Sequence, residues 1–209
     1  MFPHTLSNGM IVRIAVPSDA QALLNLVDRN RAYFESWMPF AGRTRTVEAA
    51  RQIITQYEEK CRMGLGMYCG VWNEEELIAV VLIREIDLNI RCAELGYFID
   101  RTYEGKGIIR ETCQHFIHYL FRECLLNKII ICCSADNLRS QSVPIRLGFI
   151  REALLRQNFL VNGALVDSMT FGLLACLGSV AWGEEGGEPV VVFRTKSGFE
   201  EVIENIKLA

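Results

Sequence analysis

The sequence lacks the features of three common classes of protein, namely nucleic-acid-binding, membrane-spanning and secreted proteins. It has no basic stripe, and a net charge of −3 with a pI of about 5.7 argues against sequence-independent binding to nucleic acid. The longest uncharged run, Ser168 to Gly183, has 16 residues, whereas a membrane-spanning helix needs ~20. The stretch from Met1 to Thr5 has neither the basic nor the apolar region of a signal peptide. We therefore expect a cytoplasmic protein that binds neither nucleic acid nor membranes.

Patterns of metal ligands and disulfides are missing as well. Eight cysteines are present, but none forms a CxxC pair and none has a histidine at ligand spacing. His115 and His118 are three residues apart in an expected helix, and no third ligand accompanies them. The sequence therefore predicts no metal site, and it predicts that most cysteines are small buried residues in a reducing compartment.

The chain of 209 residues is long enough for one sizeable domain with an appendage. Apolar residues make up 50% of the chain, so a full core can be buried. We expect a main domain over residues 1–176 and a linker over 177–188, because Gly178 to Glu188 contains four glycines and three glutamates. Residues 189–209 read as a strand and a helix that are too short to fold alone. This extension is expected to pack on the main domain or on a second copy in a homodimer.

Hydrophobic periodicity and turn residues predict an α+β fold with a mostly antiparallel sheet. Helices are expected over residues 18–29, 46–63, 106–124 and 137–146. Strands are expected over residues 10–16, 67–72, 77–86, 92–100, 128–133, 149–159 and 164–174. The continuous apolar run from Lys128 to Cys133 is typical of a strand that is buried on both faces. Val161-Asn162-Gly163 is a strong signal for a hairpin turn between the last two strands.

Two polar junctions stand where a strand pattern runs into a helix pattern. In the first, the strand ending near Ile99 leads through Gly105 and Gly107 into an amphipathic helix. Backbone N–H groups and the positive end of a helix dipole meet at such a junction, which makes it a natural site for a pyrophosphate. The second junction, Ser134 to Ser140, follows the next strand. Together they predict a phosphate-bearing cofactor with a reaction beside it.

Three blocks of the sequence resemble the GNAT superfamily of N-acetyltransferases, most closely the branch that acetylates N-terminal serine or alanine of ribosomal proteins. The blocks are Ala93-Glu94-Leu95-Gly96-Tyr97, Gly105-Lys106-Gly107-Ile108 and Asn137-Leu138-Arg139-Ser140, with Phe149 nine residues after Ser140. Their order and spacing carry the resemblance, which covers roughly residues 5–175. It implies the acyl-CoA N-acyltransferase fold, a central sheet flanked by helices, and acetyl-CoA as the cofactor.

The resemblance also implies where the cofactor lies. In this fold the strand 92–100 splays from the strand 128–133, and the pantetheine arm occupies the gap. The family's loop usually reads Q/R-x-x-G-x-G/A, so Glu104 and Ile109 depart from it. Main-chain N–H groups make most pyrophosphate contacts, so binding can survive these changes, and we expect Glu104 to point to solvent. The implied cofactor residues are Tyr97, Phe98, Ile99, Glu104, Gly105, Lys106, Gly107, Ile108, Ile109, Asn137 and Ser140.

Acetyl transfer from a thioester to an amine needs a donor at the carbonyl, an acid for the leaving thiolate and a neutral amine. The resemblance implies a main-chain N–H near Tyr97 or Phe98 for the carbonyl and Ser140 as the acid; an ordinary helix-capping hydroxyl is the alternative for Ser140. The branch often has a glutamate as base where Asn158 stands, and an amide cannot serve. Glu94, acting through a water, is the substitute candidate, and a solvated edge carboxylate is the alternative. No base is needed if the amine has a pKa of ~7.7–8.0.

The aromatic cluster from Tyr33 to Phe40 lies in the region that lines the acceptor site in GNAT folds, and it could equally plug the core. We predict that Tyr33, Trp37 and Asn158 contact the acceptor. An apolar wall with few charges favours a protein N-terminal amine, with an aminoglycoside or a polyamine as the alternative. A module that holds acyl-CoA without turnover is the other class considered. Cys133 could approach the cofactor thiol, although core packing is favoured.

Overall fold

The computed structural model describes residues 2–161, 163–175, 179–181 and 190–192. Eight strands form one sheet in the order β1-β2-β3-β4-β5-β6-β8-β7. β5 and β6 are parallel, and the other neighbouring pairs in this sheet are antiparallel, so the predicted α+β fold with a mostly antiparallel sheet is confirmed. The strands are β1 (His4–Thr5), β2 (Ile11–Ile14), β3 (Met67–Asn73), β4 (Glu76–Asp87), β5 (Cys92–Ile99), β6 (Lys128–Ser134), β7 (Ile150–Val161) and β8 (Ala164–Leu174).

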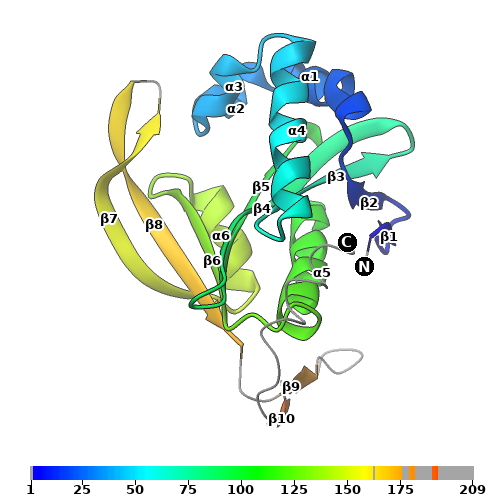
Figure 1. Ribbon diagram of the computed structural model, residues 1–209. Coiled ribbons are helices and arrows are strands. Elements are labelled where there is room, and N and C mark those ends of the chain that lie inside the picture. Colours follow the sequence, from blue (N-terminus) through cyan, green and yellow to red (C-terminus); the bar gives the residue numbers. More distant parts are fainter. Residues whose placement is uncertain (1, 162, 176–178, 182–189, 193–209) are drawn as a thin grey trace.

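Helices cover both faces of the sheet (Figure 1). Four of them, α1 to α4, precede β3 in the chain and gather on one face, whereas α5 lies on the other and α6 packs beside β6 and β7. The α-helices are α1 (Ala20–Arg29), α2 (Arg31–Glu35), α3 (Pro39–Arg43), α4 (Val47–Arg62), α5 (Ile108–Arg122) and α6 (Leu138–Arg146). Two short 3₁₀ turns, η1 (Pro17–Asp19) and η2 (Arg101–Tyr103), precede α1 and follow β5.

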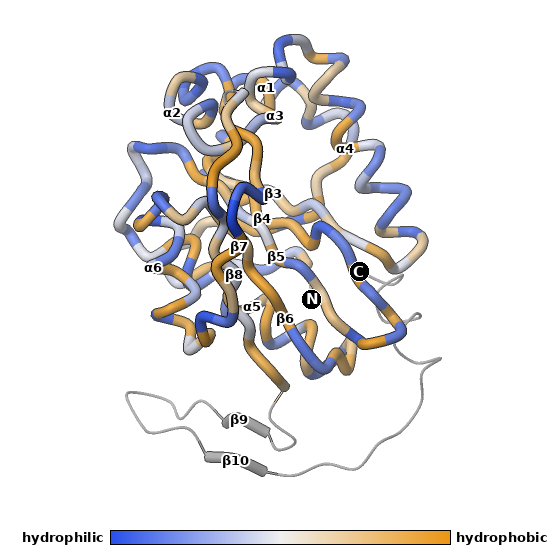
Figure 2. Tube along the Cα trace, turned by 90° about the vertical axis from the view of Figure 1, so that its left-hand side faces the viewer, coloured by the Kyte–Doolittle hydropathy of each residue, from blue (hydrophilic) through white to orange (hydrophobic). Residues whose placement is uncertain are grey.

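Each face of the sheet carries its own core, because successive side chains of a strand point to opposite faces. Val80 and Phe98 belong to the core beneath α1 to α4, whereas Val81 and Leu95 belong to the core beneath α5. Figure 2 shows that β3 to β6 run largely through hydrophobic residues, whereas hydrophilic and more hydrophobic residues alternate along α4. The sheet therefore separates two cores.

Local sequence signals account for the helix starts that matter for the site. Thr46 caps α4, since its hydroxyl accepts the Ala49 N–H at 3.1 Å, as expected. Asn137 caps α6 in the same way through the Ser140 N–H at 3.0 Å. The helix expected from residue 18 begins instead as η1, because the Asp19 carboxylate is held by Arg13 at 2.7 Å.

Other expectations need correction. The segment 33–40 belongs to two short helices, α2 and α3, which the aromatic composition did not predict. β6 is not buried on both faces, because Cys132 is exposed. Within the predicted linker, Ser179–Ala181 forms β9, which pairs antiparallel with β10 (Val190–Val192). Asn162 of the predicted turn and the helix expected over 197–207 lie outside the described residues, and the domain boundaries stay a prediction. Among the helices described, none is long and apolar enough to cross a membrane.

Candidate active site

A split in the sheet lies between the two parallel strands. β5 and β6 are paired only at their starts, from Cys92 with Lys128 to Glu94 with Ile130. Beyond Glu94 the strands diverge, as the resemblance implied, and the remaining half of β5 borders a gap. The Asp100 N–H donates to Ile78 on β4 at 2.8 Å. Because donors alternate along an antiparallel strand, the N–H groups of Tyr97 and Ile99 point away from β4 and into the gap.

The glycine loop closes one end of this gap. Gly105 and Gly107 have φ angles of 75° and 79°, in the left-handed region that favours glycine, and Gly107 is the N-cap of α5. Within the described part of the chain, the N–H groups of Gly105, Lys106 and Gly107 donate no hydrogen bond to another residue. The first N–H groups of α5 add to this set of open donors. The loop can therefore hold an anion at the positive end of the helix dipole.

Ser140 stands on the opposite side of the gap, in the first turn of α6. Its hydroxyl donates to the Tyr97 hydroxyl at 3.3 Å, and the Tyr97 hydroxyl donates to the Ser140 carbonyl at 2.7 Å. Burial raises the pKa of Tyr97 well above its usual range, so this phenol stays protonated at neutral pH. The Ser140 hydroxyl does not cap its own helix, because Asn137 does so. The resemblance implies a role only for the backbone of Tyr97, whereas the structure shows that its side chain also positions Ser140.

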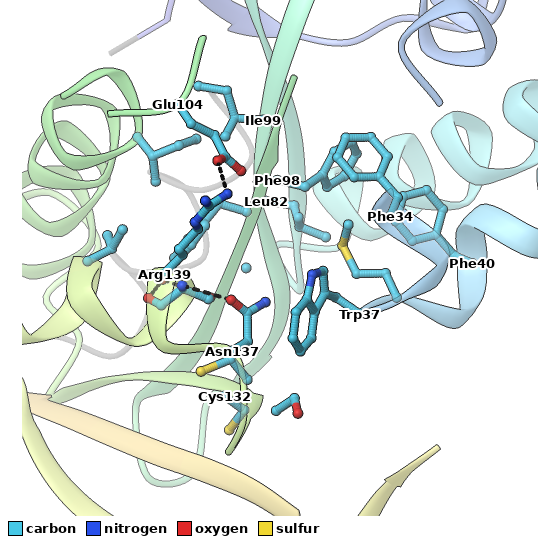
Figure 3. Close-up of a pocket in the computed structure, with 18 of the residues that line it drawn as sticks. Phe34, Trp37, Phe40, Leu82, Phe98, Ile99, Glu104, Cys132, Asn137 and Arg139 are labelled. Atoms are coloured by element: carbon cyan, nitrogen blue, oxygen red, sulfur yellow. Dashed lines mark hydrogen bonds and ion pairs between the residues drawn. The ribbon is translucent and has the colours of Figure 1, made fainter. Parts of the chain in front are cut away.

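One pocket of about 840 Å³ joins the loop, the gap and the aromatic cluster. Figure 3 shows Glu104, Arg139 and Asn137 on one side of it, and Phe34, Trp37, Phe40 and Phe98 on the other. Phe40 and Phe34 pack against Phe98 with ring centroids 5.1 and 5.4 Å apart. The predicted site residues that line it are Tyr33, Trp37, Tyr97, Phe98, Ile99, Glu104, Gly105, Gly107, Ile108, Ile109, Asn137 and Ser140. The aromatic cluster serves as both core and pocket wall.

Glu104 does not point to solvent as expected. Its carboxylate accepts a hydrogen bond from the Tyr33 hydroxyl and forms an ion pair with Arg139 at 2.8 Å (Figure 3). Burial and the Glu104 carboxylate together raise the pKa of Tyr33. Glu104, which stands where the family's loop usually has Gln or Arg, therefore connects the glycine loop to Tyr33 of the aromatic cluster and to Arg139 of α6.

Three predicted site residues do not line the pocket. Lys106 places its ammonium 4.6 Å from the Tyr103 ring centroid, so only its backbone faces the anion site. Glu94 forms an ion pair with Arg84 at 3.3 Å, and Arg84, not Glu94, reaches the pocket. Asn158 is exposed on β7 and donates to the Ser168 hydroxyl at 3.2 Å, while its neighbour Phe159 lines the pocket. Their proposed roles stay predictions.

Several arginines that line the pocket were not predicted from the sequence. Arg110 on α5 and Arg139 and Arg146 on α6 line its loop end, and Arg43 and Arg84 come from α3 and β4. Scattered single arginines give no motif, and only the spacing of Arg139 and Arg146 on one helix, seven apart, could have pointed to a shared face. Their convergence makes the pocket cationic, which suits phosphate groups.

Two adjacent cysteines reach the pocket from the end of β6. Cys132 is exposed and Cys133 is 9% exposed, so the expected core packing of Cys133 is largely confirmed. Burial raises the pKa of Cys133 to about 11, so its thiol is protonated at neutral pH and is a weak nucleophile. In the part of the chain described, no three His, Cys, Asp or Glu side chains gather closely enough to hold a metal ion.

These features fit a cofactor with a pyrophosphate and a long thin arm. Open loop amides face the pyrophosphate position, the arginines of α5 and α6 stand near it, and the gap beside Tyr97 admits an extended chain. The fold and the site define a group transferase that works across a split sheet.

Comparison with known proteins places this transferase in a family. A family model described as "Acetyltransferase (GNAT) domain" matches residues 10–150. The Bacillus subtilis (strain 168) protein named "Putative ribosomal N-acetyltransferase YdaF" is 31% identical over 175 residues, 83% of this chain and 96% of that protein. The ribosomal-protein-serine acetyltransferase of Escherichia coli (strain K12) is 26% identical over 162 residues, 78% of this chain and 90% of that protein. The chain belongs to the GNAT acetyltransferase family.

A solved structure supports the fold independently. RimL, a ribosomal L7/L12 alpha-N-protein acetyltransferase in complex with coenzyme A, superposes with a TM-score of 0.76. The match covers 79% of this chain and 93% of that protein at 22% identity, so it shows the fold alone. The acyl-CoA N-acyltransferase fold implied by the sequence blocks is thereby confirmed.

Proposed function

We propose that this enzyme transfers the acetyl group of acetyl-CoA to the N-terminal amine of a protein, as the names of its relatives indicate for them. The observation that carries the proposal is the gap between β5 and β6, which joins an anion-binding loop to an aromatic pocket. RimL is described in complex with coenzyme A, and another neighbour with acetyl-CoA and AMP. The relatives, named as ribosomal-protein acetyltransferases, support a protein acceptor over a small molecule and a catalyst over a non-catalytic module.

The chain's own residues divide the work of the reaction. Acetyl-CoA supplies an activated acetyl thioester. The Tyr97 N–H, which faces the gap, holds the carbonyl oxygen as charge develops on it. Ser140, kept in place by Tyr97 and by the first turn of α6, donates a proton to the departing sulfur. The aromatic wall and the loop hold both substrates together, and this proximity contributes much of the rate.

Deprotonation of the amine is the least demanding step. Glu94 is held by Arg84 and lies outside the pocket lining, so it acts only through a water. A free α-amino group has a pKa of ~7.7–8.0, so a sizeable fraction is neutral near pH 8 without any base. If Glu94 is the base, Glu94→Gln removes the acidic limb of the pH–rate profile. A limb that survives shows that the enzyme uses the fraction of the amine that is already neutral in solution.

The test is release of CoA from acetyl-CoA with a panel of acceptors. We expect release with peptides that begin with free serine or alanine and none with the same peptides acetylated beforehand. Spermidine and an aminoglycoside complete the panel. Turnover with either amine and with no peptide would contradict a protein acceptor, and acetyl-CoA binding without turnover on any acceptor would leave only a binding module.

A further inference from the structure

The pocket carries an excess of positive charge at the end away from the phosphate loop. Among its described lining residues the only carboxylate is Glu104, and Tyr33 and Arg139 already occupy it. Three of the five lining arginines belong to α5 and α6, beside the loop. Of those three, Arg139 is paired with Glu104, and cofactor phosphates account for Arg110 and Arg146. Arg43 on α3 and Arg84 on β4 are left without such a role.

Arg43 and Arg84 differ in what holds them. Arg84 is paired with Glu94, which offsets its charge. Arg43 is exposed, and no hydrogen bond or ion pair joins its guanidinium to another residue in the described part of the chain. It stands at the end of α3, the helix whose Phe40 packs on Phe98 in the acceptor wall. An unpaired guanidinium beside a partly desolvated pocket favours a carboxylate and disfavours a second cation.

A second observation concerns polar side chains of β3 and α4 that line the same pocket. Tyr68 on β3 lines the pocket and is 4% exposed, and its buried hydroxyl finds no hydrogen-bond partner among the described residues. Buried hydroxyls are almost always paired, since an unmade hydrogen bond is costly. Its neighbour Tyr57, with ring centroids 5.2 Å apart, and the exposed Gln56 extend a polar strip from α4. The hydroxyl and amide groups of this strip can donate hydrogen bonds to the carbonyl and carboxylate oxygens of a peptide.

We infer that the acceptor is a peptide N-terminus with an acidic side chain among its first few residues, and that Arg43 selects it. The inference rests on the proposed function and names the acceptor's chemistry. Polyamines and basic N-termini are disfavoured, because their cations would lie near Arg43 and Arg84. The Glu104 carboxylate cannot offset these cations, because it is already paired with Arg139. Arg43 is thus a specificity-determining residue.

The experiment compares peptides that begin with free serine and carry Asp, Asn or Lys at the second, third or fourth position. We expect kcat/KM to be about 3–10-fold higher for Asp than for Lys at the position that meets Arg43, as for a partly exposed ion pair. Arg43→Gln should bring this ratio to about 1, and Arg43→Glu should invert it. Arg45→Gln is the matched control, since Arg45 is exposed, pairs with Glu35 and does not line the pocket; its ratio should equal that of the wild type.

The outcomes separate the inference from the function on which it rests. Equal kcat/KM for Asp and Lys at every position in the wild type overturns the inference while leaving N-terminal acetylation intact. A preference that survives in Arg43→Gln overturns the role of Arg43. The KM for acetyl-CoA should be unchanged in both Arg43 variants, which verifies that the cofactor side is intact. No CoA release with any peptide would overturn the proposed function and the inference together.

Discussion

Ser140 is the residue at which the cofactor gap, α6 and β5 meet. Its N–H is bound by Asn137, its carbonyl by Tyr97 and its hydroxyl by the Tyr97 oxygen. The two backbone bonds fix the position of the residue, and the hydroxyl bond orients the side chain; the hydroxyl must turn from Tyr97 to donate its proton to another acceptor. A side chain so constrained is suited to act at one place in the pocket.

Replacement of this hydroxyl gives the first prediction. Ser140→Ala should lower kcat about 10–100-fold, because the leaving thiolate loses its acid. Calorimetric affinity for acetyl-CoA should change little, since Asn137 still caps α6 through the backbone. Ser36→Ala, which removes an exposed hydroxyl outside the pocket, serves as the control. An unaltered kcat would remove Ser140 as the acid.

Gly107 allows a test of the anion site at the same scale. Gly107→Val forces a β-branched residue into the left-handed region, at a cost of ~1–2 kcal/mol, and it adds bulk where the pyrophosphate would lie. Gly9 has a φ of 85° with equally open surroundings but lies far from the pocket lining, so Gly9→Val carries the strain alone. We expect calorimetry to show weakened acetyl-CoA binding for Gly107→Val only. Similar affinities for the two variants would contradict the assignment.

At the scale of elements, the end of β5 is anchored to α1. Asp100 is 3% exposed and accepts from Arg29 at 2.7 Å and from the Thr102 N–H at 2.9 Å. Burial disfavours its charged form, but the hydrogen bonds from Arg29 and Thr102 outweigh this and lower the pKa of Asp100 to about 2. The anchor holds the strand whose N–H groups face the gap, and it sets the start of the glycine loop.

This anchor predicts a dependence of stability on pH. Because the folded pKa of Asp100 lies below the unfolded value of ~3.9, its contribution is complete above about pH 4 and is lost as pH falls toward about 2. Asp100→Asn should lower the free energy of unfolding by ~2 kcal/mol near neutral pH and flatten this limb. Urea titrations between pH 2 and 7 measure both effects. Glu75→Gln, at an exposed carboxylate, should leave the curve unchanged.

In the described part of the chain, the main sheet has a core on each face, and the pocket at the candidate site lies at its split. Every described residue that lines the pocket precedes residue 160, and the Ala175 N–H donates to the Asn127 carbonyl at 2.8 Å. The β7–β8 hairpin exposes Ile150, Leu154 and Leu165, each more than half accessible. Among the described residues, the pocket is therefore formed by segments that precede the predicted linker.

Truncation after Ala175 is the prediction for this scale. We expect the acetyl-CoA affinity of the shortened chain to stay within about twofold, because the pocket-lining residues that the structure describes are all retained. Size-exclusion chromatography of the full and shortened chains tests the predicted homodimer, and a shift toward the monomer would assign the extension to the interface. Loss of acetyl-CoA binding would show that the extension completes the site.

Local sequence determined much of this protein. Periodicity and turn residues located β3, β4, β5, α4 and α5, because these elements carry strong patterns and clear caps. The two glycines of the loop could be recognised in the sequence, because this loop requires a left-handed backbone. Asn137 and Ser140 could be recognised because they form the capped first turn of α6. The short helices α2 and α3 escaped detection because five-residue segments have almost no periodicity.

Tertiary structure alone decided how the site residues meet. The engagement of Glu104 by Tyr33 and Arg139 joins segments 71 and 35 residues apart, which no local pattern records. The exposure of Cys132 follows from the divergence of β5 from β6, although its own run of residues reads as buried. The sequence by itself predicts an anion site at the start of α5, because the backbone geometry of the two glycines is a local property. Which charged side chains line one pocket was decided by the fold, because Arg43 on α3 and Arg84 on β4 are 41 residues apart in the sequence and meet only in the folded chain.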